Sequence, residues 1–534
     1  MTSLPGLRAR RAVPSHRPPL GLVLLAAVVA ALAVVPLIHL GLRVVDGGVE
    51  SLQPLLRPRT VELLISTLVL GLAVTAGAVG LGLPLAWLTT RTDLPARRAW
   101  SILAVAPMAI PSYLLAFSFV AALAPRGWLA ELLAPLGITA TPSSYGFGGA
   151  AMVLTLTTAP YVVISVRAAL ARLDPAADEA ARSLGRGPWA AARVAVMPVI
   201  LPALGAGALV ACLYAISDFG AVSILRYDTL ATAIYSQYRL SFDRSAASAL
   251  ALLLLLMALS LVWAEGRVRR RAALQVPHGA RRAPRVVSLG RWRWPALGLC
   301  AALTVLSLVV PSVTIASWLA SGLRRAPQLW DALDALRDSL LLASAVALLA
   351  LVVAVPLSWL LTHVPGRTSS ATERLLYGIY AIPGISLALA LVSLTLNVAP
   401  VLYQTLFALI LAVALRFLIQ SVGALRGPWL QISPHTREAA RSLGERPLGV
   451  LRTITLPLLK PGLLAGFAVV FLSTLKELPL TLLLAPAGFS TLATDLWDSA
   501  REAFYGQAAV PATLLLLISF LSVALLMRRG DVQA

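Results

Sequence analysis

The chain alternates long apolar stretches with short polar ones that are rich in arginine. A helix needs roughly 20 mostly apolar residues to cross the hydrocarbon core of a membrane. Twelve stretches meet this requirement, at about 20–42, 63–90, 100–123, 148–165, 195–217, 246–264, 295–319, 339–362, 376–398, 405–423, 455–476 and 510–527. The pattern therefore predicts an all-α polytopic membrane protein with about 12 transmembrane helices.

Composition supports this prediction and excludes several alternatives. Of the 534 residues, 59% are hydrophobic and 13% are charged, which is about half the charged share of an ordinary soluble domain. The net charge of +21 does not indicate nucleic-acid binding, because the basic residues lie between the apolar stretches and not along one amphipathic face. Cys212 and Cys300 lie in apolar stretches and the histidines are scattered, so no disulfide framework, metal site or cofactor is predicted.

The basic residues also predict the orientation and the segments of the chain. Arginines concentrate before the first span and in the polar linker, and positive residues favour the cytoplasmic side, so both termini are expected there. The predicted segments are a cytoplasmic N-terminus with the first span at 1–60, a first transmembrane domain at 61–264, a basic cytoplasmic linker at 265–294, a seventh span with its outer loop at 295–337, a second transmembrane domain at 338–527 and a cytoplasmic tail at 528–534.

The two transmembrane domains repeat one another. The sequence Glu-Ala-Ala-Arg-Ser-Leu-Gly occurs at Glu179–Gly185 and again at Glu438–Gly444, an offset of 259 residues. Nearer the start of each domain the offset is 272, and the long outer loop 124–147 of the first copy accounts for the difference. Six spans separate the copies, which predicts a parallel repeat around a pseudo-twofold axis along the membrane normal. Further matched pairs are Pro84 with Pro356, Ala109-Ile-Pro111 with Ala381-Ile-Pro383, Arg167 with Arg426, Pro198 with Pro457, and Thr229 with Thr491.

Each copy of the identical segment lies in a predicted cytoplasmic loop and has the chemistry of two short helices. In the second copy, Ser433 is a predicted N-cap before Pro434, Gly444 should end the helix in the left-handed conformation, and Pro447 should begin a second helix. The first copy has Asp174, Pro175, Gly185 and Pro188 at these positions. A single such loop is equally consistent with an interfacial hairpin that has no partner, but two equivalent loops favour a shared docking role.

The pattern Glu-Ala-Ala, three residues, Gly, nine residues, Ile, one residue, Leu-Pro resembles the EAA loop of type I ABC importer permeases, which have the MetI-like fold. The second copy fits in full, whereas the first has Ala195 and Met197 at two apolar positions. The resemblance covers about 61–264 and 338–527. The motif residues are Glu179, Ala180, Ala181, Gly185 and Pro198 in the first copy, and Glu438, Ala439, Ala440, Gly444 and Pro457 in the second.

The resemblance implies a multi-pass permease of the bacterial cytoplasmic (inner) membrane, in which each loop is a coupling helix. Its partners would be two copies of a cytoplasmic ABC ATPase, an extracytoplasmic solute-binding protein and membrane lipid, without nucleic acid. The chain itself is expected to be no enzyme and to have no catalytic residue. A Walker A loop needs Gly-Lys, but Lys460 and Lys476 both follow leucine, so ATP hydrolysis is assigned to the partner subunits.

The substrate is indicated by two further segments. Ser217–Thr232 and Lys476–Thr481 resemble the fused permeases of ferric iron importers, and resemble those of thiamine importers less. The resemblance thus implies ferric iron, with thiamine or another small solute as the alternative. A secondary transporter could also have 12 spans in two halves, but it would not need paired ATPase-docking loops.

Asp218 and Glu477 coincide at the 259-residue offset, near the outer ends of the fifth and eleventh spans. Charged groups at such depth are costly and usually face a cavity or a partner. These two acids, with the neighbouring Lys476, are possible residues of the translocation path. The alternative is that the acids reach the headgroup level, or that Lys476 neutralises Glu477 locally.

Overall fold

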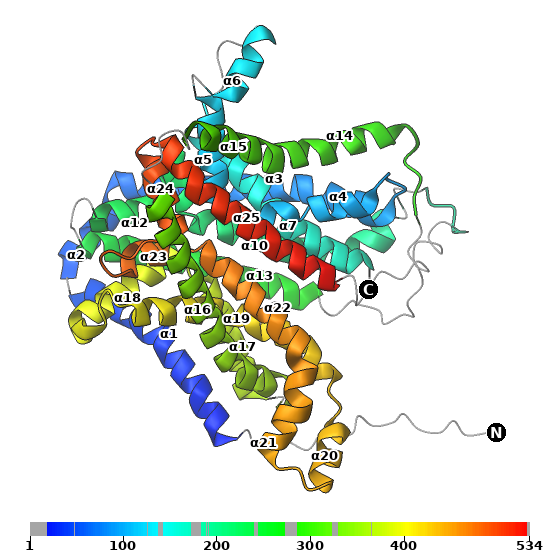
Figure 1. The fold of residues 1–534 in the computed structure, drawn as a ribbon, viewed down its shortest axis with the longest axis vertical. Coiled ribbons are helices and arrows are strands. Elements are labelled where there is room, and N and C mark those ends of the chain that lie inside the picture. Colours follow the sequence, from blue (N-terminus) through cyan, green and yellow to red (C-terminus); the bar gives the residue numbers. More distant parts are fainter. Residues whose placement is uncertain are drawn as a thin grey trace. The chain divides into compact units, whose positions relative to one another are not determined.

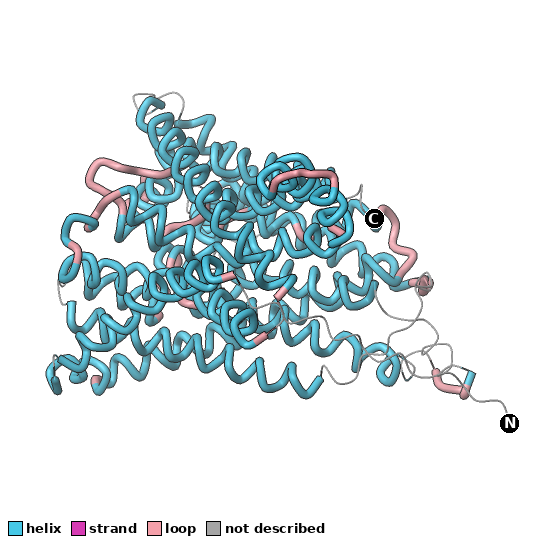
Figure 2. The backbone as a smooth tube through the Cα atoms, turned by 90° about the horizontal axis from the view of Figure 1, so that it is seen from below, coloured by secondary structure: helices cyan, strands magenta, loops and turns pink. Residues whose placement is uncertain are grey.

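The computed structural model describes residues 19–46, 48–124, 127–136, 143–171, 183–187, 190, 192–239, 244–272, 286–322, 329–364 and 366–530. Within these ranges the backbone is almost entirely helical (Figure 2), and the β-structure is limited to one isolated bridge between Thr92 and Val287. The all-α prediction is therefore confirmed for the described part of the chain.

Each of the twelve predicted spans has a helical counterpart. Nine helices among the described residues are long and apolar enough to cross a membrane, and two bent helix pairs raise this number to eleven. The apolar helix Tyr505–Leu521 is shorter and corresponds to the twelfth predicted span.

In the first half the span helices are α1 (Leu20–Asp46), α3 (Pro58–Arg91), α4 with α5 (Arg97–Leu103, Ser112–Leu123), α7 (Phe147–Ala171), α10 (Met197–Ser217) and α13 (Arg244–Ala272). In the second half they are α14 with α15 (Arg293–Thr304, Val310–Gly322), α16 (Leu329–His363), α17 with α18 (Arg367–Ala381, Gly384–Val398), α19 (Leu406–Gln431), α22 (Leu456–Leu475) and α25 (Tyr505–Gly530). The shorter helices include α2 (Gly48–Leu56), α6 (Trp128–Leu133), α11 (Gly220–Ile224), α12 (Leu230–Arg239), α20 (Pro434–Ser442), α21 (Pro447–Val450), α23 (Pro479–Leu484) and α24 (Leu492–Arg501).

The structure adds a sharp bend to the third and ninth predicted spans. Arg97–Ala109 meets Ser112–Leu123 at 95°, and Arg367–Ala381 meets Gly384–Val398 at 100°. Both breaks lie in the repeated Ala-Ile-Pro sequence. Proline disfavours the helical conformation of the residue that precedes it. Ile110, which precedes Pro111, is accordingly extended, with φ −83° and ψ 124°.

The described helices form two compact units. The first consists of Met1–Val35, Ser344–Tyr380 and Val413–Ser473, and the second of Pro36–Ala343, Ala381–Ala412 and Thr474–Ala534. The second unit therefore contains segments of both repeats, and contacts between the repeats are visible within it.

Inside the second unit, α3, α7 and α10 pack closely because small residues line their contacts (Figure 1). A Cβ atom added to Gly82 would lie 2.6 Å from Cβ of Val162, and one added to Gly71 would lie 2.7 Å from a methyl group of Ile216. Close approach at glycine is the usual way in which membrane helices associate, because burial of apolar surface gives little advantage in lipid. Larger residues at Gly71 or Gly82 would separate the helices.

The end of the basic linker is attached to the first repeat. The Val287 N–H donates to the carbonyl of Arg91 at 2.7 Å, and the Asp93 carboxylate accepts from the N–H of Leu289 at 2.8 Å and the hydroxyl of Ser288 at 3.1 Å. The bond from the Leu289 N–H is the main reason that the pKa of Asp93 is lowered. Val286, which precedes the attached residues, lines the cavity described further below.

Candidate functional site

The second repeated loop has the geometry that its residues predict. Ser433 is the N-cap of α20, and its hydroxyl accepts from the N–H of His435 at 3.3 Å. At the other end Gly444 has φ +90°. The Gly444 N–H donates to the Arg441 carbonyl at 3.0 Å and the Glu445 N–H to the Ala440 carbonyl at 3.1 Å, the two bonds of a Schellman motif. The predicted cap, left-handed glycine and turn are confirmed.

The second short helix continues directly into the membrane span. Helix α21 (Pro447–Val450) is followed by a π-helical turn, Leu451–Thr455, and then by α22, which holds Pro457 in its first turn. In Figure 1 the orange helices α20 and α21 lie together at the end of α22. No extended segment interrupts α21 and α22, so the second short helix is continuous with the span.

The side chains of α20 divide into exposed and inward-facing ones. Glu438 and Ala439 are exposed, whereas Ala440 is buried and packs inside the loop. The Glu438 carboxylate lies 3.4 Å from Nδ1 of His435, one turn earlier on the same exposed face. The acidic motif residue is therefore available to a partner.

The first loop repeats part of this geometry. Glu179, Ala180 and Ala181 lie outside the described residues. Gly185 has φ +81°, as expected for the equivalent of Gly444. Pro198 lies in the first turn of α10 and follows a π-helical turn at Ala192–Val196, so both loops enter their spans in the same way.

One exposed apolar residue in each loop was not predicted from the sequence. Leu184 is 82% exposed and Leu443 is 87% exposed, and the two are repeat equivalents immediately before Gly185 and Gly444. The two loops therefore present a large apolar side chain at the same position. The identity of the Ser-Leu-Gly sequence in both copies was the signal that could have revealed them.

Asp218 and Glu477 follow the C-terminal ends of α10 and α22, and each bonds to the start of the next helix. An oxygen of Asp218 accepts from the N–H of Ala221 at 2.8 Å, and an oxygen of Glu477 accepts from the N–H of Leu480 at 3.1 Å. Each acid therefore caps the short helix that follows it, α11 or α23. The coincidence of the two acids in the repeat thus has a structural cause in helix capping.

The bend of the third span contacts both of these segments. The hydroxyl of Ser112, at the start of α5, donates to Asp218. The ammonium group of Lys476 donates to the carbonyl of Met108 at 2.9 Å, on the other side of the bend. Lys476 thus joins the end of span eleven to span three, across the two repeats.

Two aromatic residues mark the axis that relates the repeats. Tyr235 and Trp497 are equivalent by the offset that relates Thr229 to Thr491, and their rings meet edge to face with centroids 5.5 Å apart. Residues that a twofold rotation exchanges can touch only close to its axis. Phe219 completes the cluster, with centroids 4.9 Å from Tyr235 and 5.5 Å from Trp497. The three rings therefore pack against one another close to the axis.

One hydrogen bond holds this cluster asymmetrically. The indole N–H of Trp497 donates to the hydroxyl of Ser223 at 2.8 Å. The repeat equivalents are Tyr235 and Leu482, which cannot form the same bond. The contact between the repeats therefore includes this hydrogen bond beside the aromatic packing.

The apolar spans, the repeated loop in each half and the contact between equivalent residues of the two repeats are those of the membrane-spanning subunit of a two-repeat transporter. The chain belongs to the family of binding-protein-dependent transport system inner membrane components, whose sequence profile matches residues 78–274 and 348–530. It is thus a multi-pass inner-membrane permease of ABC transport. Permease subunits of this family lack an ATPase site of their own and work with an ATPase and a solute-binding protein.

Several relatives are transport permeases. The chain is 32% identical to the Fe(3+)-transport system permease protein FbpB 2 of Haemophilus influenzae over 519 residues, covering 96% of this chain and 98% of that protein. It is 25% identical to the thiamine transport system permease protein ThiP of Escherichia coli, covering 81% and 82% of the two chains. The sulfate transport system permease protein CysT of E. coli is 31% identical over 200 residues, or 36% of this chain and 71% of CysT.

Proposed function

We propose that this permease imports ferric iron. The observation that carries the proposal is the similarity to a ferric iron permease over nearly the whole length of both chains. The thiamine permease aligns with less of the chain and at lower identity, so thiamine is the second candidate.

Each loop docks one copy of a cytoplasmic ATPase that hydrolyses ATP, and both termini lie in the cytoplasm. The exposed Glu438 and Leu443 support this assignment, because they offer a carboxylate and an apolar side chain on one short helix and its cap. Gly185, Leu184 and the motif residues Glu179, Ala180 and Ala181 have the same role in the first loop. A solute-binding protein delivers the substrate on the opposite side.

The translocation path follows the pseudo-twofold axis, past Asp218 and Glu477. Phe219 and Leu478 are repeat equivalents that directly follow these acids, and a Cβ atom on Gly220 would lie 3.2 Å from the Leu478 side chain, so both segments lie near the axis. Carboxylate oxygens are hard ligands and lower the barrier for a hard cation such as Fe³⁺. Lys476, which is bonded to Met108, keeps the bend of span three close to this point.

Uptake in proteoliposomes that contain the permease, its ATPase and its binding protein tests this function. We expect Asp218→Asn with Glu477→Gln to reduce ferric iron uptake about tenfold, which corresponds to a barrier about 1.4 kcal/mol higher. The amide oxygens can still accept the capping bonds from Ala221 and Leu480, so the fold is retained. Asp228→Asn, which removes an exposed acid, is the control.

Unchanged iron uptake in the double variant would disprove the acidic path. If the wild-type complex takes up thiamine or sulfate but no iron, the proposal that ferric iron is the substrate is wrong. A double variant that no longer assembles with the ATPase would show that the two acids act only as helix caps.

A further inference from the structure

A cavity of about 710 Å³ lies on the docking-loop side of the second unit, where α3 and α7 end and α4 begins. This volume is in the range of ordinary ligand sites. Neither the docking loops nor the proposed path uses it. The lining residues that carry the argument are Arg97, Arg98, Ser101, Ile164 and Arg167.

Arg167 is half-buried in this cavity without a carboxylate. Its guanidinium donates to the carbonyl of Ser101 at 3.2 Å, and no acidic side chain pairs with it among the described residues. The repeat equivalent, Arg426, forms an ion pair with Glu373 at 2.6 Å. The equivalent of Glu373 is Ser101, so the first repeat has kept the arginine and lost its counter-ion. A partly buried charge of this kind favours an external anion.

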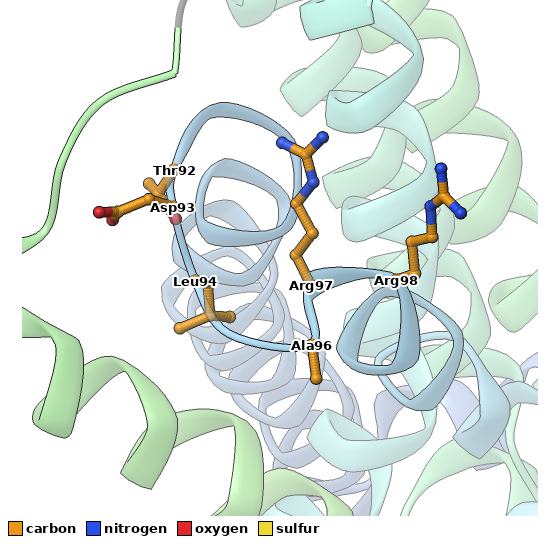
Figure 3. Close-up of a pocket in the computed structure, with 6 residues that line it drawn as sticks. All are labelled: Thr92, Asp93, Leu94, Ala96, Arg97 and Arg98. Atoms are coloured by element: carbon orange, nitrogen blue, oxygen red, sulfur yellow. The ribbon is translucent and has the colours of Figure 1, made fainter.

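Two further arginines are present only in the first repeat. Arg97 and Arg98 are exposed at the cavity and stand where the second repeat has Ser369 and Ser370. Figure 3 shows their side chains extending in similar directions, with the Asp93 carboxylate pointing away from them. Asp93 is already bonded to Ser288 and Leu289 of the linker. Arg97, Arg98 and Arg167 therefore all line the cavity.

The cavity also has an apolar wall beside the arginines. Ile164, Ala168 and Ala171 line one side, and Ile164 is 43% exposed. An anion bound here would meet donors at one end and a hydrocarbon surface at the other.

We propose that this cavity binds the phosphate group of an anionic phospholipid, with its acyl chain along Ile164 and Ala168. Arginine suits phosphate because its planar fork forms paired hydrogen bonds. Basic pockets between membrane helices on the cytoplasmic side are typical sites for such headgroups. The apolar wall favours a lipid over free phosphate or nucleotide. The described part of the second repeat differs, because Arg426 is paired with Glu373 there.

Native mass spectrometry of the purified permease in phosphatidylglycerol or phosphatidylcholine nanodiscs tests this site. We expect one tightly retained phosphatidylglycerol in the wild type. Ser101→Glu supplies to Arg167 the counter-ion that Glu373 gives Arg426, and should reduce lipid retention about tenfold. Arg97→Ser with Arg98→Ser introduces the residues that the second repeat has at these positions, and should reduce lipid retention by a similar factor. Both positions are exposed, so the fold should be retained.

The matched control is Arg367→Ser with Arg374→Ser, which removes the same charge from the equivalent region of the second repeat. Equal lipid loss in this control would show general surface attraction and overturn the proposal. It would also be overturned by unchanged retention in both cavity variants, by equal retention of phosphatidylcholine, or by displacement of the lipid with millimolar inorganic phosphate. Loss of ATPase binding with the lipid retained would assign the arginines to the ATPase instead.

Discussion

Leu443 and Gly444 are neighbours in the second docking loop, but they act through different physical properties. Leu443 exposes a large apolar side chain, whereas Gly444 supplies a backbone conformation at φ +90°. A Cβ atom on Gly444 would meet nothing within 4 Å. The requirement for glycine is therefore one of backbone conformation and not of space.

This distinction yields a prediction about ATPase docking. Gly444→Val should weaken ATPase binding about tenfold, because a left-handed non-glycine residue costs roughly 1–2 kcal/mol and the cap is expected to rearrange. Leu443→Asp should weaken it by a similar factor through loss of apolar burial. Co-purification at graded ATPase concentrations measures both effects. Gly423→Ala, a change at a helical glycine with open space, is the control.

Normal ATPase binding by both variants would disprove the docking role of this loop. Variants of Leu184 and Gly185 should show the same defect if the first loop has the same role.

At the scale of elements, α11, α12 and α24 meet around Phe219, Tyr235 and Trp497, close to the axis. The indole N–H of Trp497 donates to the hydroxyl of Ser223 beside these rings. The indole N–H of Trp429 likewise donates to the hydroxyl of Ser358 at 2.9 Å. That bond lies within the second repeat, whereas the bond from Trp497 to Ser223 joins two repeats. The two serines therefore form a matched pair for testing whether the axis opens.

Ser223→Ala should open the axis more often, because a hydrogen bond contributes about 1 kcal/mol, or roughly fivefold in a population. The measurement is the rate at which a thiol reagent modifies Ala231→Cys, a buried position on α12, with Cys212 and Cys300 replaced by alanine. We expect about fivefold faster labelling from the membrane side opposite the docking loops. Ser358→Ala should leave the rate unchanged, and equal rates in all three proteins would argue against an axial gate.

At the scale of the whole molecule, the two repeats differ in chemistry although they share a fold. Both contain the repeated loop, and in the described part of the chain the end of the linker is bonded to the first repeat, beside the arginine cavity. The second has the ion pair between Arg426 and Glu373 in the equivalent place. A fused chain can maintain such differences, because each repeat is encoded separately.

The two loops predict the composition of the complex. Native mass spectrometry should find one copy of this chain with two ATPase subunits. Gly444→Val should shift the population toward complexes that hold one ATPase, because the first loop remains intact. A wild-type complex with a single ATPase would contradict the assignment of one subunit to each loop.

Local sequence was sufficient for the features that depend on neighbouring residues. The spans follow from apolar length, the cap of α20 from Ser433 and Pro434, and the left-handed turn from Gly444. All these depend on interactions within a few residues, so the composition of a short segment decides them. The repeat added the symmetry, and the offset of 259 residues that relates the two identical loop segments also paired Asp218 with Glu477.

Tertiary structure decided what depends on distant residues. Folding brings Tyr235 against Trp497 and Lys476 against Met108, although these residues are far apart in the chain. It also leaves Leu443 exposed. The contrast between Arg167 and Arg426 also depends on folding, because Glu373 reaches Arg426 across 53 residues. Sequence offsets identify which residues are equivalent, but only folding shows which of them meet, since side-chain contacts depend on how helices pack.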